Sequence, residues 1–142
     1  MKLTREQAKT EHRKMWLWIS RQIMKDYLAD KQVRTIYGYK SFYLNRNFTD
    51  EHVASKCFCC EYAYQTSGCY RSCPFWWNDE HTALTCDEIF EHGYYDVITN
   101  IIKESYSVEG YVFVTLEEAK RAARMAYKIA MLDEKESRIR LI

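Results

Sequence analysis

The six cysteines of this 142-residue chain all lie between Cys57 and Cys86, and this crowding constrains the fold more than any other feature. Cys57 and Cys60 form a C-x2-C pair, and Cys69 and Cys73 form a looser C-x3-C pair after eight intervening residues. Two such pairs match the spacing of a closed tetrahedral zinc site, in which each pair donates two thiolates. We therefore expect Cys57, Cys60, Cys69 and Cys73 to bind one structural zinc ion.

The same cysteines could instead form disulfides or remain buried thiols. The N-terminal residues carry no apolar signal segment, and no apolar run reaches the roughly 18 to 20 residues that span a bilayer. We expect a soluble cytoplasmic protein, and cytosolic thiols stay reduced, which favours zinc over disulfides. Cys59 lies between two better-spaced thiols and is the least favoured ligand.

The composition predicts a helical single domain, 1–142, with a strong aromatic bias. One proline and four glycines are few breakers for this length, which favours helices. The 21 basic and 20 acidic residues are interspersed, which argues against a strong nucleic-acid binder. The 12 Tyr, 6 Phe and 4 Trp favour a binding face, because such side chains give contact area at low entropic cost.

Three capping boxes mark the starts of three main helices, at Thr4–Gln7, Thr85–Glu88 and Thr115–Glu118. They predict helices near 4–29, 85–105 and 115–133. The first has one apolar face at helical spacing, made of Ala8, His12, Met15, Trp16, Ile19, Ile23 and Tyr27. The last has a small-residue stripe that lets a neighbouring helix approach closely, made of Ala119, Ala122, Ala123, Ala126 and Ala130.

Two shorter segments are open to more than one interpretation. A helix is expected at 32–46, but Gly38 weakens it by about 1 kcal/mol relative to alanine, and 36–39 could be a short strand instead. Residues 111–114 are β-prone and could be an extended linker or the one strand of the protein. The predicted fold class is all-α: a small domain of three to four helices with a zinc-knuckle-like, metal-binding loop at about 50–84.

Four aromatic side chains are candidates for partner binding. Trp18 lies off the main stripe of the first helix, so it projects to solvent or a partner, or is partly covered by another helix. Phe75, Trp76 and Trp77 directly follow Cys73-Pro74. They either cap the cysteine loop as a hydrophobic lid, which small metal modules need, or form a surface for a partner.

Catalytic signatures are absent from the sequence. There is no glycine-rich phosphate loop, no H-E-x-x-H and no G-x-S-x-G. Glu88 and His92 could act as acid and base together with Asp79–His81, but such spacing is more typical of a solvated helix face. We therefore predict a protein without enzymatic activity, with no catalytic residues and with zinc as its cofactor.

Several segments occur together in a recognisable order: EHRKMWLWI at 11–19, CFCCEYA at 57–63, CPFW at 73–76, the single Cys86, and KIAML at 128–132. In this combination the chain resembles small cysteine-rich proteins encoded by phages and prophages of Gram-positive bacteria. That group has a C-x2-C pair directly before the proline, whereas here Tyr70 stands three residues before Cys73. Cys86 therefore competes with Cys69 for the fourth ligand position. The resemblance implies a phage origin and a bacterial cytoplasmic setting, without an assigned activity.

Two functions of different classes follow. The first is a phage-derived interaction protein that binds a host protein, as inhibitors of host defence do, with zinc as a structural staple. The alternative is a small-molecule binder that sequesters a nucleotide immune signal by aromatic stacking and a few Arg or Lys contacts, in a pocket between protomers of a homo-oligomer. A nucleotide that co-purifies would favour the second function, and capture of one host polypeptide would favour the first.

Overall fold

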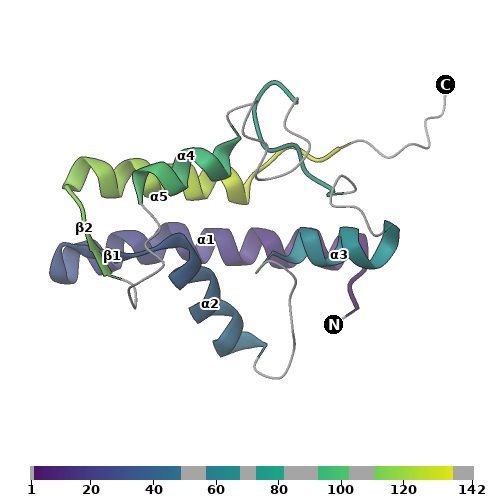
Figure 1. Ribbon diagram of the computed structural model, residues 1–142, viewed down its shortest axis with the longest axis horizontal. Coiled ribbons are helices and arrows are strands. Elements are labelled where there is room, and N and C mark those ends of the chain that lie inside the picture. Colours follow the sequence, from purple (N-terminus) through teal and green to yellow (C-terminus); the bar gives the residue numbers. More distant parts are fainter. Residues whose placement is uncertain (1, 49–56, 68–72, 82–92, 103–110, 136–142) are drawn as a thin grey trace.

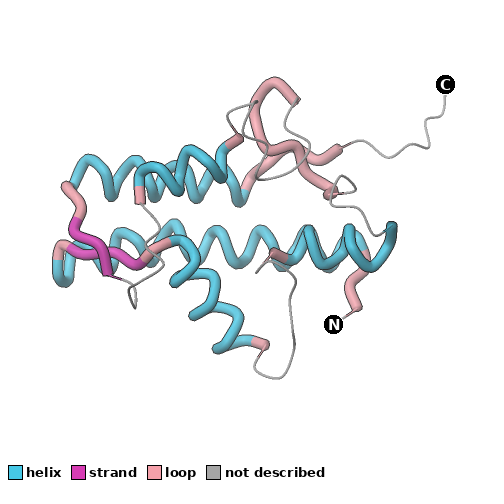
Figure 2. Tube along the Cα trace, viewed as in Figure 1, coloured by secondary structure: helices cyan, strands magenta, loops and turns pink. Residues whose placement is uncertain are grey.

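The computed structural model describes residues 2–48, 57–67, 73–81, 93–102 and 111–135. These residues form a mostly helical protein with one small sheet (Figure 2). In chain order the elements are α1 (Arg5–Asp30), β1 (Gln32–Arg34), α2 (Ile36–Asn47), α3 (Phe58–Ser67), α4 (Tyr94–Ile101), β2 (Tyr111–Phe113) and α5 (Leu116–Ala130). None of the helices in these segments is long and apolar enough to cross a membrane.

Helix α1 begins and buries its apolar face as its sequence predicts. The Thr4 hydroxyl accepts a hydrogen bond from the Gln7 backbone, and the Gln7 side chain accepts one from the Thr4 backbone. This capping box satisfies two backbone donors that the first turn leaves without partners. The helix then buries one continuous face, which consists of Ala8, His12, Met15, Trp16, Ile19 and Ile23.

Helix α5 runs antiparallel to α1 and lies against it along most of its length (Figure 1). It also starts with a capping box, between Thr115 and Glu118. Its buried face carries four alanines at helical spacing, Ala119, Ala122, Ala126 and Ala130, together with Ile129. Because alanine has only a methyl side chain, the backbones approach closely and large α1 side chains such as Trp16 fill the interface. Helix α4 packs on α5, and α3 packs on α1.

The segment predicted as a helix at 32–46 contains both a strand and a helix. Residues Gln32–Arg34 form β1, which pairs antiparallel with β2 so that Val33 faces Val112. Thr35 then caps α2, because its hydroxyl accepts a hydrogen bond from the Gly38 backbone. The possible strand at 36–39 is therefore helical. The β-prone segment at 111–114 is confirmed as a strand, β2.

The cysteine region differs from the predicted knuckle-like loop. Cys59 and Cys60 lie in the first turn of α3, and the Cys57 carbonyl accepts a hydrogen bond from the Glu61 backbone at 3.0 Å. Further on, the segment 74–76 pairs with the C-terminal segment 133–135 through two backbone hydrogen bonds. A knuckle is not shown, and the predicted loop at 50–84 contains a helix. Of the helix predicted at 85–105, α4 is described, whereas the capping box at Thr85–Glu88 lies outside the described residues.

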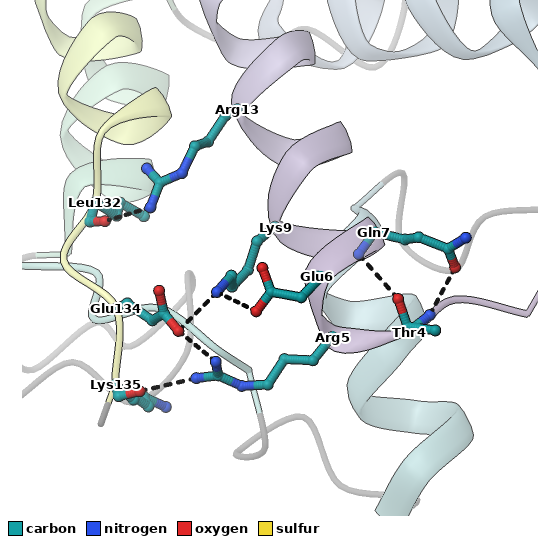
Figure 3. Close-up of polar contacts among 9 residues, drawn as sticks. All are labelled: Thr4, Arg5, Glu6, Gln7, Lys9, Arg13, Leu132, Glu134 and Lys135. Atoms are coloured by element: carbon teal, nitrogen blue, oxygen red, sulfur yellow. Dashed lines mark hydrogen bonds and ion pairs between the residues drawn. The ribbon is translucent and has the colours of Figure 1, made fainter. Parts of the chain in front are cut away.

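A group of charged side chains ties the start of α1 to the segment that follows α5 (Figure 3). Glu134 accepts hydrogen bonds from both Arg5 and Lys9, and Lys9 also binds Glu6 at 2.7 Å. Arg5 donates a further hydrogen bond to the Lys135 carbonyl at 2.8 Å. Hydrogen bonds from Lys9 and Arg5 lower the pKa of Glu134 below its ordinary value of 4.5.

This shift predicts how Glu134→Gln changes stability with pH. The lowered pKa stabilises the fold above the unfolded-state pKa, and that contribution is lost as the pH falls through the folded-state pKa. Because the Glu134 side chain is 39% exposed, we expect the variant to lose at most about 1 kcal/mol at neutral pH. The difference from the parent should shrink as the pH falls below the unfolded-state pKa and disappear below the lowered folded-state pKa, where the carboxyl is protonated in both states.

Urea denaturation at several pH values measures this difference. Glu117→Gln is the matched control, because the ion pair between Glu117 and Arg124 is long, at 3.7 Å, and both side chains are largely exposed. We expect this control to match the parent protein at every pH. A Glu134→Gln penalty that persists unchanged in acid would show that the carboxylate charge is not its cause.

Candidate functional site

Cys57, Cys59, Cys60 and Cys73 are buried and form one group, called here the thiol cluster. The first three come from the start of α3, and Cys73 comes from the loop that leads toward α4. Three of the four predicted zinc ligands therefore lie in the cluster. The fourth, Cys69, and its competitor Cys86 lie outside the described residues.

The thiols of the cluster perturb one another in a row from Cys60 through Cys57 and Cys59 to Cys73. Hydrogen bonds with Cys59 and Cys60 lower the pKa of Cys57 well below its ordinary value, and they outweigh its burial. A hydrogen bond with Cys59 is likewise the main cause that lowers the pKa of Cys73. The start of a helix also favours thiolates, because backbone N–H groups there carry partial positive charge.

Cys59 has a more central place than its spacing predicts. Its thiol interacts with both Cys57 and Cys73, and burial followed by these two contacts raises its pKa well above the ordinary value. Cys59 is thus the protonated partner between two groups that favour the thiolate form. The sequence prediction that it is the least favoured ligand rests on spacing alone, whereas the structure places it between two predicted ligands.

Two lysines act electrostatically on this cluster from different elements. Lys40 of α2 is only 5% exposed and its charge lowers the pKa of Cys57. Its ammonium group donates to the Tyr95 hydroxyl at 3.2 Å and lies 4.6 Å from the centre of that ring. Burial lowers the pKa of Lys135, and the charge of the nearby Cys73 thiolate opposes part of this shift. A buried lysine is costly unless negative charge lies close, so Lys40 suits a cluster that contains thiolates.

His12 of α1 adjoins the cluster and is the functional candidate that sequence reasoning missed. The side chain is fully buried, and its Nε2 lies 2.8 Å from the Ile129 carbonyl oxygen. Its Nδ1 is buried and has no hydrogen-bond partner in the part of the chain that the structure describes. The ring also interacts with Cys57 and contributes to the lowered pKa of that thiol. In the sequence His12 is one member of an apolar face, and only the fold shows its neighbours.

The described residues do not form a ready-made metal site. No group of three or more His, Cys, Asp or Glu side chains among them is arranged so that it could hold a metal ion as it stands. The row of thiols is instead held by contacts between neighbours and by the indole of Trp77, whose Nε1 donates to Cys73 Sγ at 3.4 Å.

Of the four aromatic candidates for partner binding, two are buried and two are half-buried. Phe75 and Trp77 are fully buried next to the thiol cluster, which agrees with the alternative that they act as a hydrophobic lid. Trp76 is half-buried and stacks on His81. Trp18 is also half-buried, because Phe42 stacks on it at 5.8 Å between ring centres. This arrangement agrees with the alternative in which another helix, here α2, partly covers Trp18.

The acid and base candidates are only partly described. Glu88 and His92 lie outside the described residues. His81 binds Asp133 at 2.8 Å. Near it, a hollow of about 130 Å³ is lined by side chains that include Trp76, Asp79 and Tyr94. This volume is well below the roughly 300–1,000 Å³ of pockets that enclose small-molecule ligands.

Two tryptophans provide a matched test of the hydrogen bond that supports Cys73. Trp77→Phe removes the donor to Cys73 Sγ, while Trp16→Phe removes an indole N–H that has no partner among the described residues. Both side chains are almost fully buried, so the loss of ring volume is similar. We expect Trp77→Phe to reduce the free energy of unfolding by about 1 kcal/mol more than Trp16→Phe. Chemical denaturation under reducing conditions measures this, and equal losses would mean that the N–H···S contact contributes nothing.

Comparison with protein-family models, curated proteins and solved structures found no match to this chain. Its function is therefore argued from the thiol cluster and from the exposed side chains of the fold. The cluster provides soft ligands and negative charge in a buried setting. The exposed side chains determine what a partner could contact.

Proposed function

We propose that the protein is a phage-derived interaction protein without enzymatic activity, whose cysteine region is stapled by a structural zinc ion. The observation that carries the metal is the gathering of four buried cysteines in the core. The lowered pKa values of Cys57 and Cys73 agree with it, because they favour the thiolate form. Thiolates are soft ligands that suit zinc. A zinc ion would satisfy negative charge that is otherwise costly to bury, and Lys40 offsets part of the remainder.

The proposed ligands are Cys57, Cys60, Cys69 and Cys73, with Cys86 as the alternative to Cys69. Binding would replace thiol–thiol contacts with thiolate–zinc bonds, so the thiols in the described row would have to turn toward one ion. A fully buried cage of this kind has no open position for substrate, which is why the role is structural. Structural zinc contributes roughly 10 kcal/mol or more of apparent binding free energy, enough to order a segment with few apolar contacts.

The proposed partner surface lies where β1, β2 and α2 adjoin (Figure 1). Tyr111 and Phe113 are on the same side of β2 and are 51% and 77% exposed. Arg34 lies over the rings of both Tyr111 and Phe42. We call Phe42, Tyr111 and Phe113 the aromatic face.

This aromatic face suits a protein partner. Exposed aromatic rings beside an arginine are the side chains that most often dominate protein–protein binding energy. Trp18 stacks on Phe42 and so holds this ring of the aromatic face in place. Its proposed role in partner binding is therefore to position Phe42. The resemblance to phage proteins supports a host protein as the partner, including one that acts in host defence.

Metal analysis of the purified chain tests the zinc ion. We expect one zinc per chain, and we expect Cys57→Ser and Cys73→Ser to lose it and to unfold at lower denaturant concentration. Cys69→Ser and Cys86→Ser form a matched pair: the variant that keeps its zinc identifies the cysteine that is not a ligand. Zinc well below one per chain, with six thiols titrating after denaturation, would contradict the proposal.

Affinity capture from lysate of the bacterial host tests the aromatic face. We expect the parent protein to retain one host polypeptide and Phe113→Asp to lose it, with a binding penalty of at least about 2 kcal/mol. Tyr64→Asp is the control, because Tyr64 is similarly exposed but lies on α3. Equal loss in both variants would refute the aromatic face, and a co-purifying nucleotide would favour the alternative function.

A further inference from the structure

We propose that His12 of α1 supplies a ligand to the metal ion of the thiol cluster, through its Nδ1 atom. The inference rests on the proposed zinc ion and changes its ligand set from cysteines alone to cysteines with one histidine. It also changes what the metal does, because the ion would then link α1 directly to the cysteine region.

The hydrogen bond to α5 fixes the tautomer of His12. Its Nε2 lies 2.8 Å from the Ile129 carbonyl oxygen, and a carbonyl oxygen only accepts hydrogen bonds. The proton of the neutral ring must therefore be on Nε2, which leaves a lone pair on Nδ1. A histidine that binds a metal through one nitrogen commonly donates the other N–H to a backbone carbonyl, and His12 shows this arrangement before any metal is bound.

The lone pair on Nδ1 has no hydrogen-bond partner within the described segments although the whole side chain is buried. Leaving such an atom without a partner costs about 1–3 kcal/mol. A buried polar group of this kind therefore calls for an explanation, such as a bound ion. A metal ion bound to Nδ1 would remove the cost.

The neighbours of the ring are the cysteines of the cluster and the residues that hold them. The His12 ring is close enough to the Cys57 thiol to affect the pKa of that thiol, although Nδ1 itself has no hydrogen-bond partner among the described residues. On another side, Trp77 meets the His12 ring edge-on at 5.5 Å between ring centres, and the same indole donates to Cys73 Sγ. His12 thus adjoins the residues that hold Cys57 and Cys73, and a shared ion would require these side chains to turn toward it, because no three such ligands among the described residues are arranged around one point as they stand.

The ring is also held still, as a metal ligand requires. Phe75 packs on it at 4.8 Å between ring centres, and the guanidinium of Arg13 lies 4.6 Å from the centre of the Phe75 ring. Arg13 in turn donates to the Ala130 carbonyl at 2.8 Å. His12 is therefore restrained by α5 on one edge and by the residues that follow Cys73 on its faces.

Two substitutions separate a metal ligand from a core histidine. His12→Gln keeps an amide N–H that can reach the Ile129 carbonyl but provides a poor ligand, while His12→Cys provides a thiolate but loses that hydrogen bond. Co²⁺ binding to the reduced, metal-free full chain, followed by competition with Zn²⁺, measures affinity and reports the ligands through the visible spectrum. We expect His12→Gln to weaken metal binding about 100-fold or more, since even outer-shell partners of a ligand are worth 10- to 100-fold.

His12→Cys should restore affinity to within about 10-fold of the parent and add thiolate-to-cobalt charge-transfer absorption. His81→Gln is the control, because His81 is exposed and bound to Asp133. If His12→Gln binds Co²⁺ as tightly as the parent and with the same spectrum, the His12 inference is wrong while the zinc proposal stands. If the parent binds neither Co²⁺ nor Zn²⁺, both are wrong.

A measurement on the parent protein covers the case in which a His12 variant does not fold. Long-range nitrogen–hydrogen correlation spectra resolve the ring nitrogens of each histidine. Addition of Zn²⁺ should shift the Nδ1 signal of His12 and leave its Nε2 protonated. A Zn²⁺-loaded protein in which the Nδ1 signal does not move would overturn the inference.

Discussion

The close antiparallel contact between α1 and α5 forms the frame on which most of the other described elements pack. Four alanines on α5 let the two backbones approach, and the large side chains of α1 fill the space between them. The same contact brings the Ile129 carbonyl to His12 and the Ala130 carbonyl to Arg13. The position of the histidine beside the thiol cluster is thus a consequence of helix packing that begins with small side chains.

The thiol cluster shows why burial alone does not determine the state of a cysteine. Burial opposes the thiolate form at all of Cys57, Cys59 and Cys73. At Cys57 and Cys73 the hydrogen bonds from neighbouring thiols are stronger than that effect, whereas at Cys59 the contacts act in the same direction as burial. Identical cysteine side chains therefore differ in whether they favour the thiol or the thiolate form, according to their neighbours. Soft metal ions bind the thiolate form.

Local signals in the sequence predicted the parts of the fold that depend on local contacts. The capping boxes at Thr4 and Thr115 gave the starts of α1 and α5, because a cap is formed within four residues. Helix α3 was missed, since its ten residues have no such cap and no clear apolar period. The division of 32–46 into β1 and α2 was also missed, because β1 exists only through pairing with β2 about 80 residues away.

The candidate site was predictable only where spacing carries information. The C-x2-C spacing identified Cys57 and Cys60, but the central place of Cys59 and the approach of Lys40 and His12 depend on how separate helices pack. Phe75 and Trp77 are buried beside the cysteines, as the interpretation of a hydrophobic lid predicts. A sequence pattern therefore located the site, and tertiary contacts determined which other residues belong to it.

Segment 133–135 forms hydrogen bonds both with Arg5 and with the segment 74–76, and these bonds affect how fast the protein folds. The hydrogen bonds of Arg5 connect residues 129 and 130 positions apart, so almost the whole chain must be closed into a loop before they form. Helical domains usually fold quickly because their contacts are local, and folding rates fall as the mean sequence separation of contacts rises. Despite its helical content, this chain should fold with the slower kinetics of a protein whose two ends must meet, and it should expose its cysteines to solvent during that search.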